Sequence, residues 1–202
     1  LSLTSPTAAL NSNCLMKFAS NEFRKSSVKN LINKTVCSIA VVLSIVFSLA
    51  PNMQTSQQGL EHIANLEGCR TKAYQCSADV WTNGLGHTTG VKQGDVVSEE
   101  HIARNFIADI KTAEKSVNQY LTVDVTQAQF DVLVSFVFNL GAGNFKRSTM
   151  LKLFNQNQSS KACLELSRWV YVNGKNCRDP DSQCSGVVKR RELEQQACLN
   201  GW

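Results

Sequence analysis

The chain has 202 residues, enough for one ordinary domain with an extension, and a formal net charge of +5. Residues 1–51 contain five basic residues and one acidic residue, whereas residues 52–202 contain sixteen basic and fifteen acidic residues. Because the positive excess belongs to the N-terminal segment, it does not indicate nucleic-acid binding. The three histidines lack the spacing of metal ligands, so we expect neither a metal nor a cofactor.

The eight cysteines indicate an oxidising compartment rather than the cytosol. No Cys-x-x-Cys pair is present, which argues against a thiol oxidoreductase. A membrane-tethered thiol exchange protein nevertheless remains an alternative because of the cysteine count.

The N-terminal part combines a polar, basic segment with an apolar one. Residues 1–34 form the basic segment, and residues 1–15 precede the first methionine, Met16, so we interpret them as lying before the native start. Residues 36–50 then run without a charge. A basic run before an apolar one sets membrane orientation, and we assign residues 35–51 to a hydrophobic helix.

Three interpretations of this helix compete. As a permanent anchor it is short, because fifteen residues at about 1.5 Å each span about 22 Å of a hydrocarbon core about 30 Å thick. As a signal peptide it ends in Ser48-Leu-Ala50, which resembles a cleavage site, but Pro51 would follow the cut directly. The third interpretation, which we prefer, is an uncleaved, marginal helix that inserts and later leaves the bilayer. All three place residues 52–202 outside the cytoplasm.

The domain of residues 52–202 begins with a predicted helix that ends at Glu67, before Gly68. Its apolar positions recur at helical spacing (Leu60, Ile63, Ala64 and Leu66). Strand-forming residues broken by glycines follow, and they predict a hairpin or small sheet that extends to about Gly94 (Tyr74, Val80, Trp81, Thr82, Gly84 and Gly86). A carboxyl group at a helix end thus faces a β-lobe with other reactive side chains, which predicts a cleft.

The remaining elements are predicted to be helical. Ser98 with two following acids begins a helix to about Tyr120. Thr126 and Gln129 form a capping box before an apolar core helix, which the glycines at 141 and 143 are expected to stop (Phe130, Leu133, Val134, Val137 and Phe138). Short helices are predicted over 148–155, 160–171 and 186–199. Helices after a β-lobe indicate an α+β fold with two lobes and a groove between them.

The stretch from Glu67 to Thr88 resembles the phage-type lysozymes of glycoside hydrolase family 24. Glu67, Cys76 and Thr82 fall in register on that family's pattern of Glu, eight residues, Asp or Cys, five residues, Thr. Residues 84–88 match its Gly-x-Gly-His-Thr turn, and residues 130–143 and 186–192 resemble its C-terminal lobe. The similarity extends over residues 56–202. It implies a two-lobed lysozyme fold, with a small β-lobe and a larger helical lobe, preceded here by the hydrophobic helix.

Cys76 stands where the best-known members of the family carry Asp. Cysteine at this position resembles a variant found in endolysins with an N-terminal signal-arrest-release (SAR) segment. The resemblance implies a monomeric endolysin, exported by the Sec pathway, tethered to the inner membrane through residues 36–50 and then released to the periplasm.

The resemblance also implies the reaction, which is hydrolysis of the β-1,4 bond between N-acetylmuramic acid and N-acetylglucosamine in peptidoglycan, causing host lysis. Glu67 is the expected acid, which must stay protonated to act near neutral pH and therefore needs partial burial or a negative neighbour. Cys76 acts as a base, a nucleophile or a group that orders water, and Thr82 orients the attacking water. The alternatives are a catalytically weak peptidoglycan-binding protein and a lytic transglycosylase.

The SAR resemblance further implies control by disulfide exchange. We expect Cys69–Cys76 in the tethered form and Cys37–Cys69 in the released form, in which Cys76 is free. By elimination the remaining cysteines give two structural disulfides, Cys163–Cys198 and Cys177–Cys184.

Four further polar residues lie near the candidate site in the sequence or on the last predicted helix. Asp79, the rival carboxylate, is expected in a surface turn, and His87 is expected to brace the β-lobe through a hydrogen bond. For Arg190 and Arg191 two positions stay open, either directed toward the cleft or on an exposed helix face.

Overall fold

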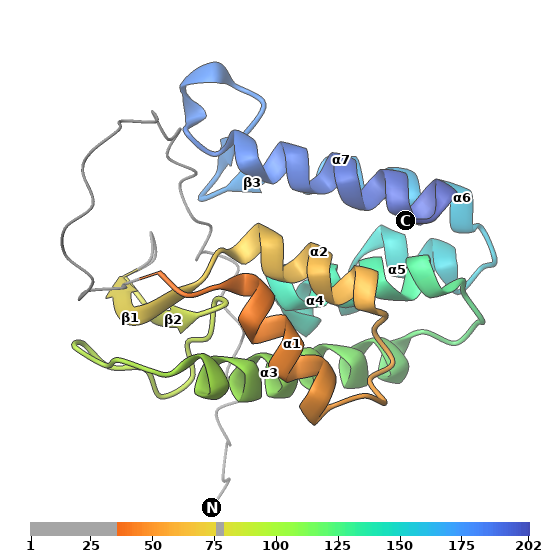
Figure 1. The fold of residues 1–202 in the computed structure, drawn as a ribbon. Helices are drawn as coiled ribbons and strands as arrows, with labels where there is room; N and C mark the ends of the chain where they lie inside the picture. Colours follow the sequence, from red (N-terminus) through yellow and green to blue (C-terminus); the bar gives the residue numbers. More distant parts are fainter. Residues whose placement is uncertain (1–35, 76–78) are drawn as a thin grey trace, which may run out of the picture.

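The computed structural model describes residues 36–75 and 79–202, which form an α+β arrangement dominated by helices. The β1–β2 hairpin lies at one end of the molecule, and α7 lies on the side opposite α1 and α3 (Figure 1).

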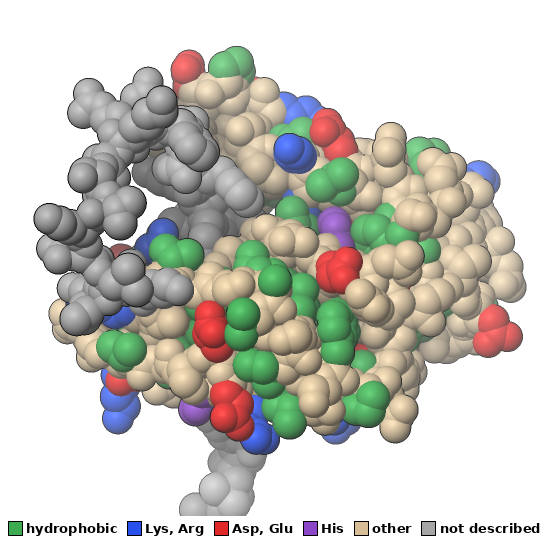
Figure 2. Space-filling model, in the orientation of Figure 1, with side chains coloured by type: hydrophobic (Ala, Val, Ile, Leu, Met, Phe, Trp, Pro, Cys, Tyr) green, Lys and Arg blue, Asp and Glu red, His purple; other side chains and the backbone are tan. Residues whose placement is uncertain are grey.

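Helix α1 (Ile39–Leu49) covers the centre of the apolar segment, and Ser38 caps its N-terminus. It packs against α2 (Gln57–Glu67) and α3 (Glu99–Tyr120) and buries three residues (Val42, Leu43 and Val46). Residues 36–38 are not helical, so the helix is shorter than the predicted 35–51. Apolar side chains gather over α1 on the face drawn in Figure 2. Val41 and Leu49 of this helix are exposed. No helix within the described ranges has both the length and the apolar character that a membrane crossing needs.

Strands β1 (Arg70–Gln75) and β2 (Trp81–Gly84) form the predicted antiparallel hairpin. Tyr74 pairs with Thr82 and Arg70 pairs with Gly84, with a bulge between them. The other edge of β1 is covered by residues 95–97, because Ala73 N–H donates to the carbonyl of Asp95 at 2.8 Å. This covering leaves little of the β1 backbone unpaired.

Helices α3 and α4 (Gln127–Lys146) begin where their caps predict, at Ser98 and at the capping box of Thr126 and Gln129. α4 contacts α2, α3, α5 and α7 and is therefore the central helix of the core. The predicted stop at residues 139–145 is confirmed as a break at Gly141, and a second helical segment follows it directly. Only Gly141 leaves helical geometry (φ 80°, ψ 157°), and the helix resumes after this kink.

The C-terminal part consists of short elements and one long helix. Helices α5 (Thr149–Phe154) and α6 (Ser159–Leu164) are followed by a 3₁₀ turn, η1 (Glu165–Arg168). A small hairpin (β3, Tyr171–Val172, and β4, Lys175–Asn176), the turn η2 (Pro180–Ser182) and α7 (Ser185–Asn200) complete the chain. The helix predicted over 160–171 therefore ends at 168, and Tyr171 lies in a strand instead.

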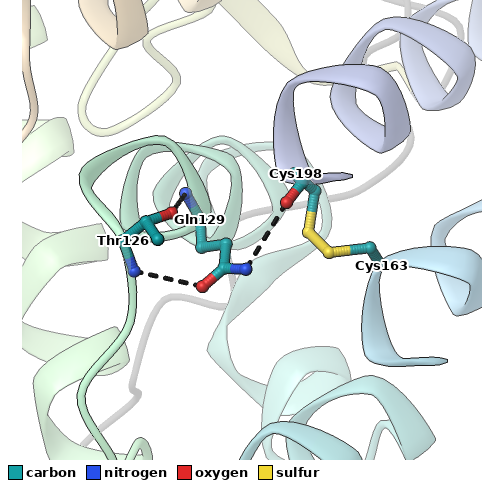
Figure 3. The surroundings of a disulfide bond; sticks show 4 residues. All are labelled: Thr126, Gln129, Cys163 and Cys198. Carbon is teal, nitrogen blue, oxygen red and sulfur yellow. Dashed lines mark hydrogen bonds between the residues drawn. A yellow bond between two sulfur atoms is a disulfide. The ribbon is translucent and has the colours of Figure 1, made fainter. Parts of the chain in front are cut away.

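Three disulfides join described residues. Cys163–Cys198 links α6 to α7, close to the capping box of α4, where Gln129 Nε2 donates to the carbonyl of Cys198 at 3.5 Å (Figure 3). Cys177–Cys184 closes the loop before α7, and Cys37–Cys69 ties the residue before the N-cap of α1 to the residue before β1. The first two pairs are those expected by elimination, and the third is the pair expected for a released form. Cys76 and Cys14 lie outside the described residues.

Candidate active site

Glu67 is the last residue of α2, at the point where the helical part of the protein meets the hairpin. Gly68 caps the helix with φ 67°, a left-handed value that favours glycine, and so allows the chain to turn directly into β1. The Glu67 side chain is 12% exposed. It is therefore mostly enclosed but still reaches solvent, as a group that acts on an external substrate must.

Arg190 of α7 fixes one oxygen of this carboxyl group. Its Nη1 donates a 2.6 Å hydrogen bond to Glu67 Oε1, and the arginine itself is 2% exposed. The same guanidinium donates to Glu194 Oε1 (3.1 Å) and to the hydroxyl and carbonyl oxygens of Ser135 (3.2 and 3.3 Å). Because the planar fork is held by several partners, the position of Glu67 Oε1 is determined by α4 and α7.

Glu194 is the anchor of this cluster, and it is completely buried. It accepts hydrogen bonds from Ser135 Oγ at 2.6 Å and from both arginines. Burial would raise the pKa of Glu194, but Arg191, His62 and Arg190 together lower it to about 2. Two arginines and one fully buried glutamate form the centre of this cluster, and the carboxyl group of Glu67, when ionised, brings its net charge to zero.

The pKa values of the two arginines shift in opposite directions, although both side chains are buried. Burial acts to lower the pKa of Arg190, but the carboxylates of Glu67 and Glu194 outweigh it and raise that pKa. Burial lowers the pKa of Arg191 to about 10, since Glu194 compensates only in part and Arg190 opposes it. The alternative that these arginines occupy an exposed helix face is wrong, and Arg190 is directed to Glu67.

The hairpin part contributes Gly86 next to the second oxygen of Glu67. Gly86 has φ +86°, and a Cβ at this position would lie 3.1 Å from Glu67 Oε2. Among the described residues Oε2 accepts no hydrogen bond. One oxygen of the carboxyl group is thus held by the helical part, while the other is left beside the hairpin for a proton or a substrate atom.

Tyr74 and Thr82 face each other across the hairpin, near this site. Burial, followed by the charge of Glu67, raises the pKa of the Tyr74 phenol to about 12, and Arg70 opposes the shift. Thr82 is completely buried, and its hydroxyl donates to the carbonyl of Val80 at 3.1 Å. The structure therefore brings Glu67, Arg190, Gly86 and Tyr74 together and fixes Thr82 in β2.

His87 and Asp79 both lie in the β-lobe, as predicted, and flank β2. His87 Nδ1 lies 2.8 Å from Asp109 Oδ2 of α3 and therefore braces the turn after β2. The hydrogen bond to Asp109 raises the pKa of His87 more than burial lowers it. Asp79 is exposed at the turn before β2.

Sequence reasoning missed Glu194 and Ser135 and left Arg190 undecided. Arg190 and Glu194 are four residues apart and share a helix face, a spacing that favours an ion pair but does not reveal its third partner. The link from Arg190 to Glu67 crosses 123 positions, so no local pattern indicates it.

A family model and known relatives match this chain. The model for the Phage lysozyme family matches residues 64–194. The endolysin of Acyrthosiphon pisum secondary endosymbiont phage 1 is 40% identical over 144 residues, which cover 70% of this chain and 95% of the relative. The SAR-endolysin of Escherichia phage P1 is 33% identical over 178 residues, covering 82% of this chain and 92% of the relative.

Two crystal structures of the phage P1 endolysin Lyz differ in their similarity to this chain. The active form matches with a TM-score of 0.74 at 32% identity, over 84% of this chain and 97% of that chain. The secreted inactive form matches with a TM-score of 0.50 at 32% identity, over 73% of this chain and 96% of that chain. The arrangement of residues 36–75 and 79–202 is therefore more similar to the active form.

Proposed function

Because the chain belongs to the phage lysozyme family, a family of glycoside hydrolases, we propose that it is an endolysin that hydrolyses the β-1,4 bond between N-acetylmuramic acid and N-acetylglucosamine in peptidoglycan. Cleavage of this bond lyses the host cell. The observation that carries the proposal is the asymmetric environment of Glu67, with Oε1 bound to Arg190 and Oε2 beside Gly86 without a described partner.

In the proposed mechanism Glu67 Oε2 gives its proton to the leaving glycosidic oxygen. The transfer leaves a negative carboxylate, and Arg190 is already in place to balance that charge at 2.6 Å. Because the guanidinium is fixed by Ser135 and Glu194 before the reaction, no reorganisation is needed as the charge develops.

We assign Cys76 and Thr82 to the attack on the anomeric carbon. The assignment rests on their register with the family pattern, since Cys76 lies outside the described residues. The buried position of Thr82 on β2 gives its hydroxyl a fixed orientation, which suits a group that directs a water molecule. Cys76 then serves as base, nucleophile or water-ordering group.

A turbidity assay on chloroform-treated Gram-negative cells tests the proposed activity. The protein is expected to clear the suspension, and Glu67→Gln is expected to abolish clearing while it retains the fold. Glu61→Gln, on the same helix and bonded only to Gln57 among the described residues, is the matched control and should clear normally. Clearing by Glu67→Gln at the normal rate would refute the role of Glu67.

We further propose that the apolar segment first sits in the inner membrane after Sec export and then leaves it to become α1. The packing of α1 on α2 and α3 supports a released state in which this segment is part of the folded domain. The charge-free run of residues 36–50, preceded by a basic segment, supports a second environment that is apolar. The catalytic domain would be periplasmic in both states.

Release is proposed to activate the enzyme by disulfide exchange. The thiolate of Cys37 attacks the sulfur of Cys69 in a Cys69–Cys76 bond, the Cys37–Cys69 bond forms, and Cys76 leaves as a thiolate. The Cys37–Cys69 bond in this structure and its greater similarity to the active form of the P1 enzyme support this order. Non-reducing peptide mapping before and after membrane depolarisation tests the exchange, and an unchanged pairing would contradict it.

A further inference from the structure

A pocket beside strand β1 carries the positive charges of Arg70 and Lys72. The pocket has a volume of about 370 Å³ and is lined by Val36, Arg70, Lys72, Ala73 and Tyr74. This volume falls within the range of small-ligand sites, about 300–1,000 Å³. Arg70 and Lys72 are exposed, and neither makes an ion pair with any residue of 36–75 or 79–202.

The pocket combines an ordered positive charge with apolar side chains. The Arg70 guanidinium lies over the Tyr74 ring, 4.5 Å from its centroid, which holds its charge at the pocket instead of free in solvent. The buried side chain of Ala73 and the edge of Val36 complete an apolar wall. A ligand that suits this site carries a carboxylate together with small apolar groups.

The pocket lies next to the catalytic carboxyl group. Arg70 follows Glu67 by three residues, so their Cα atoms are at most about 11 Å apart. Arg70 lies over the Tyr74 ring, and the pKa of Tyr74 responds to the charges of both Glu67 and Arg70, so the three side chains lie near one another. A peptide of four residues extends for about 13 Å, enough to reach from a sugar held at Glu67 to Arg70 and Lys72.

We propose that this pocket binds the carboxylates of the stem peptide attached to N-acetylmuramic acid, so that the enzyme recognises the peptide as well as the glycan. The inference rests on the proposed function, because that function places the muramic acid at Glu67.

The test compares two substrates, purified sacculi with intact stem peptides and glycan strands freed of peptide by an amidase. For Arg70→Gln/Lys72→Gln, KM for the peptide-bearing substrate is expected to rise about three- to tenfold, the scale of two solvent-facing charge contacts. The loss on peptide-free strands is expected to be smaller, so the ratio of the two kcat/KM values falls. High salt should reduce the difference between the enzyme and the variant.

Two controls separate this inference from a general charge effect. Lys111→Gln removes an exposed positive charge on α3 and should leave the ratio unchanged, whereas Arg70→Lys/Lys72→Arg keeps both charges and should restore it. Equal losses on both substrates, or no loss on either, would overturn the stem-peptide site. If the unsubstituted protein cleaved neither substrate, the proposed function itself would fail.

Discussion

Arg190 on the last helix places its Nη1 2.6 Å from Oε1 of Glu67 at the end of α2, across 123 positions of sequence. The arginine is almost wholly buried, and the glutamate is not. A fixed positive charge therefore lies against one oxygen of this carboxyl group, and the other oxygen accepts no hydrogen bond from the described residues.

Arg190→Gln is expected to reduce both stability and activity. It leaves Glu194 with one arginine partner and Glu67 with none, and breaking a buried ion pair costs on the order of 3 kcal/mol. Thermal melting should show this loss, and lysis should fall at least tenfold at temperatures where the variant stays folded, since misplacing a catalytic group by about 1 Å can cost about a hundredfold. Arg168→Gln, which breaks the exposed pair with Glu165, should cost about 0–1 kcal/mol and no activity.

Gly86→Ala is expected to harm activity beyond its effect on stability. A Cβ at this position would lie 3.1 Å from Glu67 Oε2, so the carboxyl group has to move. Gly90→Ala is a matched control, because Gly90 also has positive φ (+74°) but nothing within 4 Å of its added Cβ. Both variants should lose about 1 kcal/mol of stability to backbone strain. If both lost equal activity, the contact with Glu67 would be irrelevant.

The His87–Asp109 pair predicts a pH dependence of stability. The pKa of His87 in the folded protein is raised above the unfolded value of about 6.5. Its stabilising contribution is therefore complete below pH 6.5 and is lost as the pH rises through the folded value. Melting temperatures measured between pH 5 and pH 9 should show this decline. Asp109→Asn should flatten that part of the profile, and an identical slope in enzyme and variant would exclude the pair as its source.

Cys37→Ser separates the stability of the Cys37–Cys69 bond from its role in regulation. The bond closes a loop across 32 positions, so its loss should cost about 3–4 kcal/mol in the chain-entropy model. The variant leaves Cys69 free to pair with Cys76, and lysis should fall strongly. Cys37→Ser/Cys69→Ser should be comparably destabilised but should lyse cells, because Cys76 stays free. Equal activity of the two variants would argue against the exchange.

Local signals in the sequence predict much of the fold. The cap at Ser98 and the capping box at Thr126 locate the starts of α3 and α4, because these contacts lie within four residues. The break at Gly141 follows from the backbone freedom of glycine. The second helical segment directly after it could not be predicted, because it depends on tertiary packing around α4. Tyr171 is in a strand because its backbone partner, Asn176, is supplied by a turn that helical periodicity does not reveal.

The candidate site is predictable only in part. The position of Glu67 before Gly68 indicates a carboxyl group at a helix end, and the family register singles it out. Its partners come from α4 and α7, and their proximity depends on how these helices pack. The burial of Arg190 could not be predicted, since two adjacent arginines on a helix are usually solvated. Cys76 stays a prediction, because it lies outside the described residues.

The incorporation of oxygen-18 from labelled water into the cleavage products of purified sacculi tests the central claim most directly. Hydrolysis with Glu67 as the acid predicts one labelled oxygen at each new reducing end of a muramic acid, and no such products from Glu67→Gln. Unlabelled anhydro-muramyl ends, or labelled products formed at an undiminished rate by Glu67→Gln, would contradict it.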